Sequence, residues 1–109
     1  MYKRQLLNNQ SSATTINEFP ALNAKGFSIR YKIDRGSDSR TGEMIISCTT
    51  THISYDDNSV DANADVGVDL VAALDNKDST AGNETVAFKF TTTSTGTDAT
   101  IDYQTTILA

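Results

Sequence analysis

Oxygen-bearing side chains are concentrated in one short segment of the sequence, and they form the pattern with the clearest potential for chemistry. Asp61, Asn63 and Asp65 alternate with other residues, a spacing that suits the oxygen ligands of a hard cation such as Ca²⁺. A helical calcium loop beginning at Asp61 would have Gly in the place of Val66 and an acidic residue in the place of Ala72. We therefore predict a solvated turn in which Asp and Asn bond their own backbone, and keep Asp61, Asn63 and Asp65 as the candidate residues for a bound calcium ion.

The chain offers few residues and motifs of the kinds that enzymes use for catalysis. His52 is the only histidine and lies between Thr51 and Ile53 in a segment expected to be a strand, so we predict a surface or inter-subunit residue and not a general base. Cys48, the only cysteine, ends an apolar run and is predicted to be a buried structural thiol. The sequence has no glycine-rich phosphate loop and no dinucleotide-binding fingerprint. These features predict a protein that is not an enzyme and uses no cofactor.

The charge balance and the hydropathy pattern exclude two further classes of function. With 14 Asp and Glu against 9 Lys and Arg, the formal net charge is −5, and no basic cluster is present that would neutralise phosphates. Nucleic acid is therefore not an expected partner. No apolar stretch approaches the ~18–20 residues that a helix needs to cross a bilayer, and the N-terminus lacks the apolar core of a signal peptide. We expect no membrane partner, and synthesis in a cytoplasm without secretion.

Several segments alternate between apolar and polar residues, which is the pattern of a strand with one buried and one solvated face. Clusters of Gly, Ser, Asn and Asp separate them, as is typical of turns. A polar turn at 35–40 is predicted to close a hairpin, and the Asp-rich segment 56–65 is predicted to be a loop. The faces expected to be buried are Phe27/Ile29/Tyr31/Ile33, Met44/Ile46/Cys48, Val66/Val68/Leu70, Val86/Phe88/Phe90 and Ala99/Ile101/Tyr103/Thr105/Ile107.

Short strands at nearly even spacing, with no segment of helical period, predict an all-β fold. We expect an antiparallel β-sandwich of jelly-roll-like type in a single domain, with residues 25–109 forming the sandwich. A barrel-like closure remains an alternative, because both architectures give the same alternation. Residues 1–24 are predicted to form either an N-terminal arm on a neighbouring subunit or an edge strand, and Pro20, the only proline, fits an edge.

The order of polar and apolar stretches between residues 8 and 105 resembles that of a known class of protein. The stretches are Asn8-Asn9-Gln10-Ser11-Ser12-Ala13-Thr14-Thr15, Ser28-Ile29-Arg30-Tyr31-Lys32-Ile33 with Arg35-Gly36, Arg40-Thr41-Gly42-Glu43-Met44-Ile45-Ile46, the segment 61–70 and the segment 86–103. They follow one another as in small β-domains of tailed-bacteriophage virion proteins, at the tips of tail fibres and spikes or in head decoration proteins. The resemblance is one of strands and turns and carries no catalytic residue.

The resemblance implies a non-catalytic structural protein located in the virion and made in the host cytoplasm. A domain of this type is expected to assemble as an oligomer, with a homotrimer favoured, and to bind other virion proteins of the capsid or tail. Fibre domains usually end a longer chain, whereas Met1 suggests a complete small gene product, which favours a head decoration (cement) protein or a small capsid or tail appendage. The alternatives are a fibre fragment with Met1 added and a receptor- or glycan-binding tip module with a host surface receptor as partner.

Exposed apolar residues near both ends of the chain are the expected contacts with partner subunits. An apolar C-terminus without a charged tail is better buried against protein than left in water, and tyrosines serve interfaces well. Tyr31 and Tyr103 are instead expected to be core residues, because they lie on predicted inward faces. The candidate interface residues are Tyr2, Leu6, Leu7, Phe19, Ile107 and Leu108.

Overall fold

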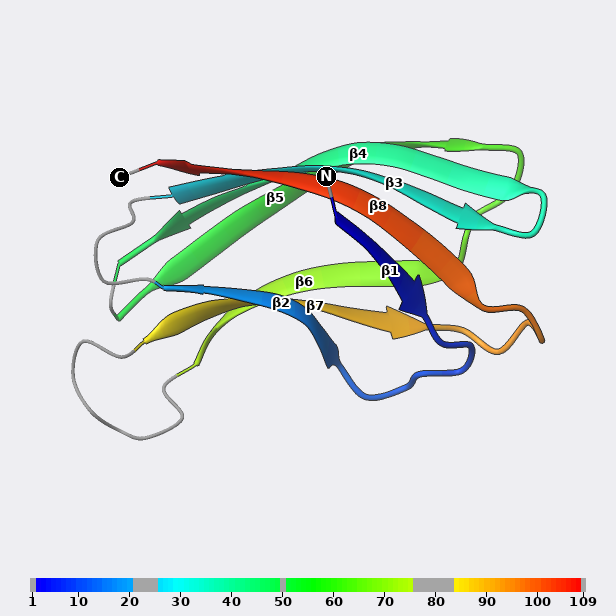
Figure 1. Ribbon diagram of the computed structural model, residues 1–109, viewed down its shortest axis with the longest axis horizontal. Coiled ribbons are helices and arrows are strands. Elements are labelled where there is room, and N and C mark those ends of the chain that lie inside the picture. The colour runs from blue at the N-terminus through cyan, green and yellow to red at the C-terminus, as the bar shows by residue number, and fades with distance from the viewer. Residues whose placement is uncertain (1, 21–25, 50, 76–83, 109) are drawn as a thin grey trace.

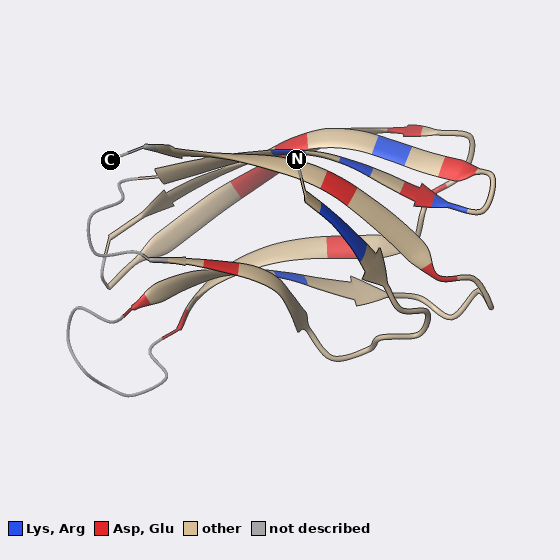
Figure 2. Cartoon of the chain, in the orientation of Figure 1, with Lys and Arg blue, Asp and Glu red and all other residues tan. Residues whose placement is uncertain are grey.

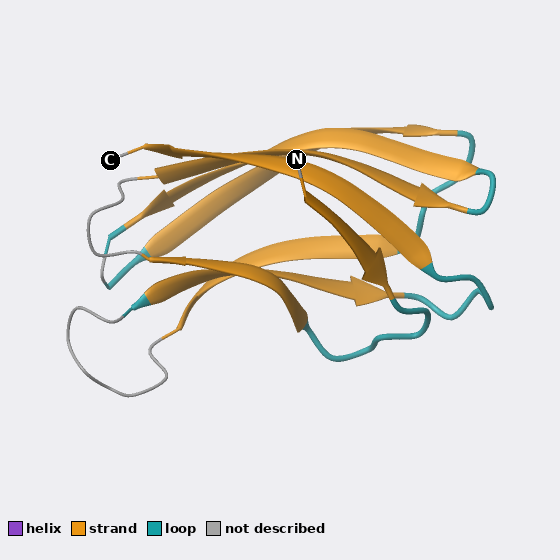
Figure 3. Cartoon of the chain, in the orientation of Figure 1, coloured by secondary structure: helices purple, strands orange, loops and turns teal. Residues whose placement is uncertain are grey.

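The computed structural model describes residues 2–20, 26–49, 51–75 and 84–108. Within these ranges the backbone forms strands and turns and no helix (Figure 3). Every pairing between the strands is antiparallel. The strands are β1 Tyr2–Leu6, β2 Thr14–Pro20, β3 Gly26–Arg35, β4 Asp38–Cys48, β5 Ile53–Ala62, β6 Val68–Asp75, β7 Thr85–Thr92 and β8 Ala99–Leu108.

The strands lie in two sheets that pack face to face (Figure 1). The larger sheet has five strands in the order β1-β8-β3-β4-β5, and the smaller has three in the order β2-β7-β6. The two sheets stay separate, with β1 and β5 at the edges of the larger sheet. The predicted all-β antiparallel sandwich is confirmed, and the barrel-like alternative is wrong.

The core between the sheets is formed by the faces that the alternation predicted, except at the end of β8, where Ile107 is 53% exposed although it was expected to be buried. Phe27, Ile29 and Ile33 on β3 are at most 1% exposed, and Met44 and Ile46 on β4 are equally buried. The larger apolar side chains of β7 and β8 complete the cluster. Because burial of one large apolar side chain contributes about 1.5–3 kcal/mol, this cluster is the main source of the stability of the fold.

β3 and β4 form the predicted hairpin with a tighter turn than expected. Their last register pair is Arg35–Asp38, so the turn consists of Gly36 and Ser37 alone. Gly36 has a φ of 61°, in the left-handed region that a two-residue hairpin turn requires. The predicted turn at 35–40 was therefore too long, and the two residues that follow Asp38 belong to β4.

The Asp-rich segment that was predicted to be a loop over 56–65 is mostly strand. β5 pairs with β4 along its whole length and ends only at Ala62. Both of its faces are open to water, with Tyr55 42% exposed on one face and Val60 75% exposed on the other. An edge strand without a covered face has no need of an alternating apolar pattern, which is why Asp and Asn are accommodated here.

The N-terminal residues pair within the same chain. β1 pairs with β8 at one edge of the larger sheet, and β2 pairs with β7 at one edge of the smaller sheet. Both strands place side chains in the core, where Leu6 is fully buried and Ile16 is 4% exposed. A further cluster of turn-forming residues in the sequence, 75–83, lies, apart from Asp75, outside the described residues.

Candidate functional site

The inner face of the larger sheet carries a polar contact that links three neighbouring strands. Tyr31 on β3 lies directly opposite Gly42 on β4. Because Gly42 has no side chain, the Tyr31 ring crosses β4, and its hydroxyl donates a 2.6 Å hydrogen bond to Oδ1 of Asp57 on β5. A Cβ atom at Gly42 would lie 2.7 Å from the Tyr31 hydroxyl and 2.7 Å from Cβ of Ser59. Burial, together with the bond to Asp57, raises the pKa of Tyr31 above its ordinary value.

The calcium candidates Asp61 and Asp65 both face the guanidinium of Arg40. Arg40 Nε donates to Asp61 Oδ1 at 2.9 Å, and its Nη2 donates to Asp65 Oδ1 at 3.0 Å. Asn63 is turned elsewhere, since its amide nitrogen donates to Asp38 Oδ1 at 2.7 Å. Burial opposes the charge on Arg40, but the two carboxylates outweigh it and raise its pKa. The structure thus brings Asp61 and Asp65 together around an arginine, and a cation at this place would have to compete with Arg40.

His52 and Cys48 lie at the turn between β4 and β5. His52 precedes β5, so the prediction that it belongs to a strand was wrong. The side chain is exposed, and its Nδ1 lies 2.9 Å from the Thr51 hydroxyl. Cys48 is buried as predicted, and burial raises the pKa of its thiol. A raised thiol pKa is the reverse of what a nucleophilic cysteine requires.

Arg35 is buried at one end of the sandwich, with only 4% of its surface exposed. The sequence predicted a turn residue here, although Arg35 lies two positions after Ile33 and so continues the inward-facing alternation of β3. Its guanidinium donates to Asn8 Oδ1 at 2.8 Å, to the Thr93 carbonyl at 2.6 Å and to the Thr97 carbonyl at 2.9 Å. Its Nη1 also donates to the carbonyls of the residues just before β6. One side chain therefore fixes three loops and holds this end of the sandwich rigid.

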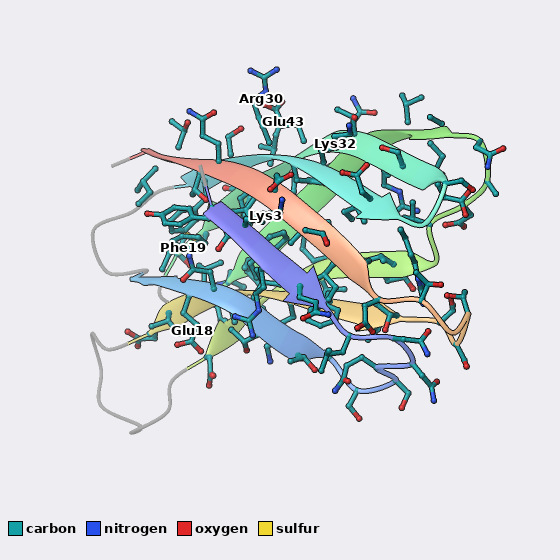
Figure 4. All side chains as sticks on the ribbon, turned by 45° about the vertical axis from the view of Figure 1, so that its right-hand side comes forward. Lys3, Glu18, Phe19, Arg30, Lys32 and Glu43 are labelled. Atoms are coloured by element: carbon teal, nitrogen blue, oxygen red, sulfur yellow. The ribbon has the colours of Figure 1, made fainter. Side chains whose placement is uncertain are left out.

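The outer face of the larger sheet is hollowed and lined by polar side chains. The hollow has a volume of about 650 Å³. Figure 4 shows Arg30, Lys32 and Glu43 projecting from this face, away from the smaller sheet. Basic, acidic and amide groups of four adjacent strands alternate here, so the surface offers hydrogen-bond donors and acceptors together. The polar lining includes Arg30, Lys32, Glu43, Asn58, Asp102 and Gln104.

The candidate interface residues divide into buried and exposed groups. Leu6 is fully buried and Phe19 is 8% exposed, with its ring 5.2 Å from that of Phe27. Both residues therefore pack in the core of their own chain and are not available to a partner. Tyr2, Leu7 and Ile107 are 60%, 53% and 53% exposed and remain available.

Two of the remaining expectations concern tyrosines and the C-terminus. Tyr31 and Tyr103 are 3% and 4% exposed, which confirms them as core residues. The Tyr2 ring packs on Tyr103 with a centroid separation of 5.5 Å. Leu108 ends β8, but its side chain lies outside the described part of the chain.

Comparisons with known proteins give no assignment. No protein family, no curated protein and no solved structure matches the chain. Within the described residues no helix is long and apolar enough to cross a membrane. A functional proposal therefore rests on the fold, on the surfaces described above and on the resemblance between residues 8 and 105 that the sequence carries.

Proposed function

We propose that the protein is a non-catalytic structural protein of a tailed-bacteriophage virion, either a head decoration protein or a small appendage of the capsid or tail. It assembles as an oligomer on the particle. The observation that carries the proposal is the long, water-exposed edge strand β5, which has a hydrogen-bonded neighbour on one side only among the described residues. An open strand edge is a surface on which another protein chain can add a strand.

The rest of the molecule fits a part that is built into a larger assembly. The buried core and the Arg35 contacts make a rigid unit, so little ordering entropy opposes association. Exposed apolar side chains such as Tyr2, Leu7 and Ile107 supply contact area outside the sheet edges.

The experiment that tests this proposal uses virus particles produced from the genome that encodes the chain. The particles are purified by density gradient and analysed by quantitative mass spectrometry and by electron microscopy with a specific antibody. We expect the protein at a fixed copy number per particle, and particles made without the gene should regain it when the purified protein is added. A protein that is abundant in infected cells and missing from purified particles would overturn the proposal.

A second candidate function is a receptor- or glycan-binding module, and the hollow on the outer face favours it. Sugars are recognised by hydrogen bonds from planar polar side chains, and Arg30, Glu43 and Asn58 present such groups side by side. A glycan array probed with the labelled protein tests this function. Binding that is lost in Arg30→Ala, and kept in Lys89→Ala on the smaller sheet, would support it, and an array without signal would exclude it for the glycans displayed.

A further inference from the structure

The two edges of the larger sheet differ in charge. β1 contributes Lys3 and Arg4 to one edge, and β5 contributes Asp56, Asp57 and Asp61 to the other. Figure 2 shows the basic band on β1 and the acidic bands on β5 at opposite margins of the same sheet. Pairing of β5 with β5 or of β1 with β1 would set like charges against each other, whereas pairing of β1 with β5 sets opposite charges together.

The directions of the strands allow such a pairing between two copies in the same orientation. Each neighbour in the order β1-β8-β3-β4-β5 is antiparallel to the next, so β1, β3 and β5 run the same way. A second copy placed beside the first as a continuation of the sheet therefore brings its β1 parallel to β5.

The faces of the two strands also correspond. Tyr2 is paired with the inward-facing Tyr103, so Tyr2 and Arg4 lie on the inner face and Lys3 lies on the outer face. Tyr55 is paired with the inward-facing Ile46, so Tyr55 and Asp57 lie on the inner face. The sequence Tyr-Lys-Arg-Gln of β1 can thus be set against the sequence Tyr-Asp-Asp-Asn of β5 with every side chain on the matching face.

We propose that β1 of one copy pairs in parallel with β5 of a second copy, in the register that places Lys3 beside Asp56 and Arg4 beside Asp57. In this register the two exposed tyrosines, Tyr2 and Tyr55, lie next to each other. Gln5 and Asn58 are then also neighbours. The Gln5 amide nitrogen donates to Asp98 Oδ2 at 2.8 Å, which leaves the Gln5 Oε1 as an acceptor for the Asn58 amide. This inference deepens the proposed function and rests on it for its biological setting.

The side chains of Asp57 and Arg4, which the pairing brings together, can each form further hydrogen bonds. Asp57 uses Oδ1 for Tyr31, which leaves Oδ2 as an acceptor. Arg4 uses Nη1 for the Ile16 carbonyl at 2.9 Å, and its guanidinium keeps further N–H groups in an exposed side chain. The contact joins two different surfaces, so it is heterologous and generates a closed ring or an open filament, never a two-fold dimer.

Substitutions that exchange the charges of Lys3 on β1 and Asp56 on β5 test the proposal. The solution mass of the protein is measured by light scattering over a dilution series for the wild type, for Lys3→Asp, for Asp56→Lys and for the double variant. We expect the wild type to be an oligomer, with a mass that is a whole multiple of the single-chain mass of 11.8 kDa. The oligomer should dissociate at high salt, because salt screens the attraction between opposite charges. Each single variant should weaken assembly at least tenfold, and the double variant should restore it.

Two controls make the same charge changes away from the two edges of the larger sheet. Asp69→Lys alters the exposed face of the smaller sheet, and Lys32→Asp alters the centre of the larger one. Both should assemble as the wild type does, with circular dichroism confirming the fold of every variant. A wild type that stays monomeric, or a double variant no better than the single ones, would overturn the pairing.

The outcome separates this inference from the proposed function. A monomer that is nevertheless found on virus particles would eliminate the β1–β5 contact and leave the virion role standing. An oligomer that obeys the charge exchange and is absent from particles would establish the contact and remove the virion role.

Discussion

Tyr31 and Gly42 face each other across β3 and β4, and the missing side chain of Gly42 is what lets the Tyr31 ring reach the edge strand. An aromatic ring that covers a cross-strand glycine protects its backbone and gives the ring a fixed direction. Here the direction leads to Asp57, so a central strand of the sheet holds the outermost one by a side-chain bond.

Gly42→Ala should destabilise the protein by about 1–3 kcal/mol, because the new methyl group collides with Tyr31 and Ser59. Urea denaturation measures the loss in the free energy of unfolding. The control is Thr41→Ala, the neighbouring exposed position of β4, which should change stability by less than about 0.5 kcal/mol. Equal effects of the two substitutions would contradict the role of the Tyr31–Gly42 contact.

The stability of the protein should fall as the pH rises above about 10, and Tyr31 should account for part of the fall. An unfolded tyrosine titrates at 10.0, whereas the folded chain keeps the Tyr31 proton to higher pH. The contribution of the neutral phenol is therefore complete below that pH and is lost as the pH rises towards the folded pKa. The free energy of unfolding, measured between about pH 8 and about pH 11, should decline less steeply in Tyr31→Phe. Parallel curves for the two proteins would refute this.

Arg35→Met should cost more than about 3 kcal/mol, because the buried carbonyls that now accept from the guanidinium would be left without donors. Arg35→Lys should recover only a part, since an ammonium group cannot reach three loops at once. Thermal unfolding gives the comparison, with Arg30→Met on the exposed outer face as the control. A loss no larger than that of the control would show that the loops are held by other contacts.

Calcium at about 1 mM should leave the melting temperature of the wild type unchanged, because Asp61 and Asp65 are engaged by Arg40. In Arg40→Met the two carboxylates lose their partner, and calcium should then raise the melting temperature. Differential scanning fluorimetry with calcium and with magnesium provides the measurement. A calcium-dependent rise in the wild type would mean that the ion displaces the arginine.

The fold was predictable where one face of a strand is buried. Phe27, Ile29 and Ile33 alternate with polar residues because the smaller sheet covers one side of β3. This alternation is visible in the sequence and indicates a strand with one buried face. The prediction failed for β5, where neither face is covered and Asp57 and Asp61 receive their partners from β3 and β4. Those partners are distant in the sequence, so composition alone indicated a loop.

The functional surfaces were less predictable than the fold. The pairing of β1 with β8 places Tyr2 and Leu6 on the same inner face, yet Tyr2 is 60% exposed and Leu6 is fully buried, a difference that no local pattern contains. Arg35 is the clearest example of a buried residue that was not predicted from the sequence. Its position next to a hairpin glycine is typical of a solvated residue, and its burial depends on loops from three other parts of the chain.

The contacts of Arg35 also bear on the order of events in folding. Its hydrogen bonds reach residues that are 27 to 62 positions away in the sequence, whereas the β3–β4 hairpin beside it closes through a two-residue turn. Closing long loops is entropically slow, so the hairpin is expected to form early and the three loops to dock on the guanidinium near the end. Substitution of Arg35 should then accelerate unfolding and leave the refolding rate almost unchanged.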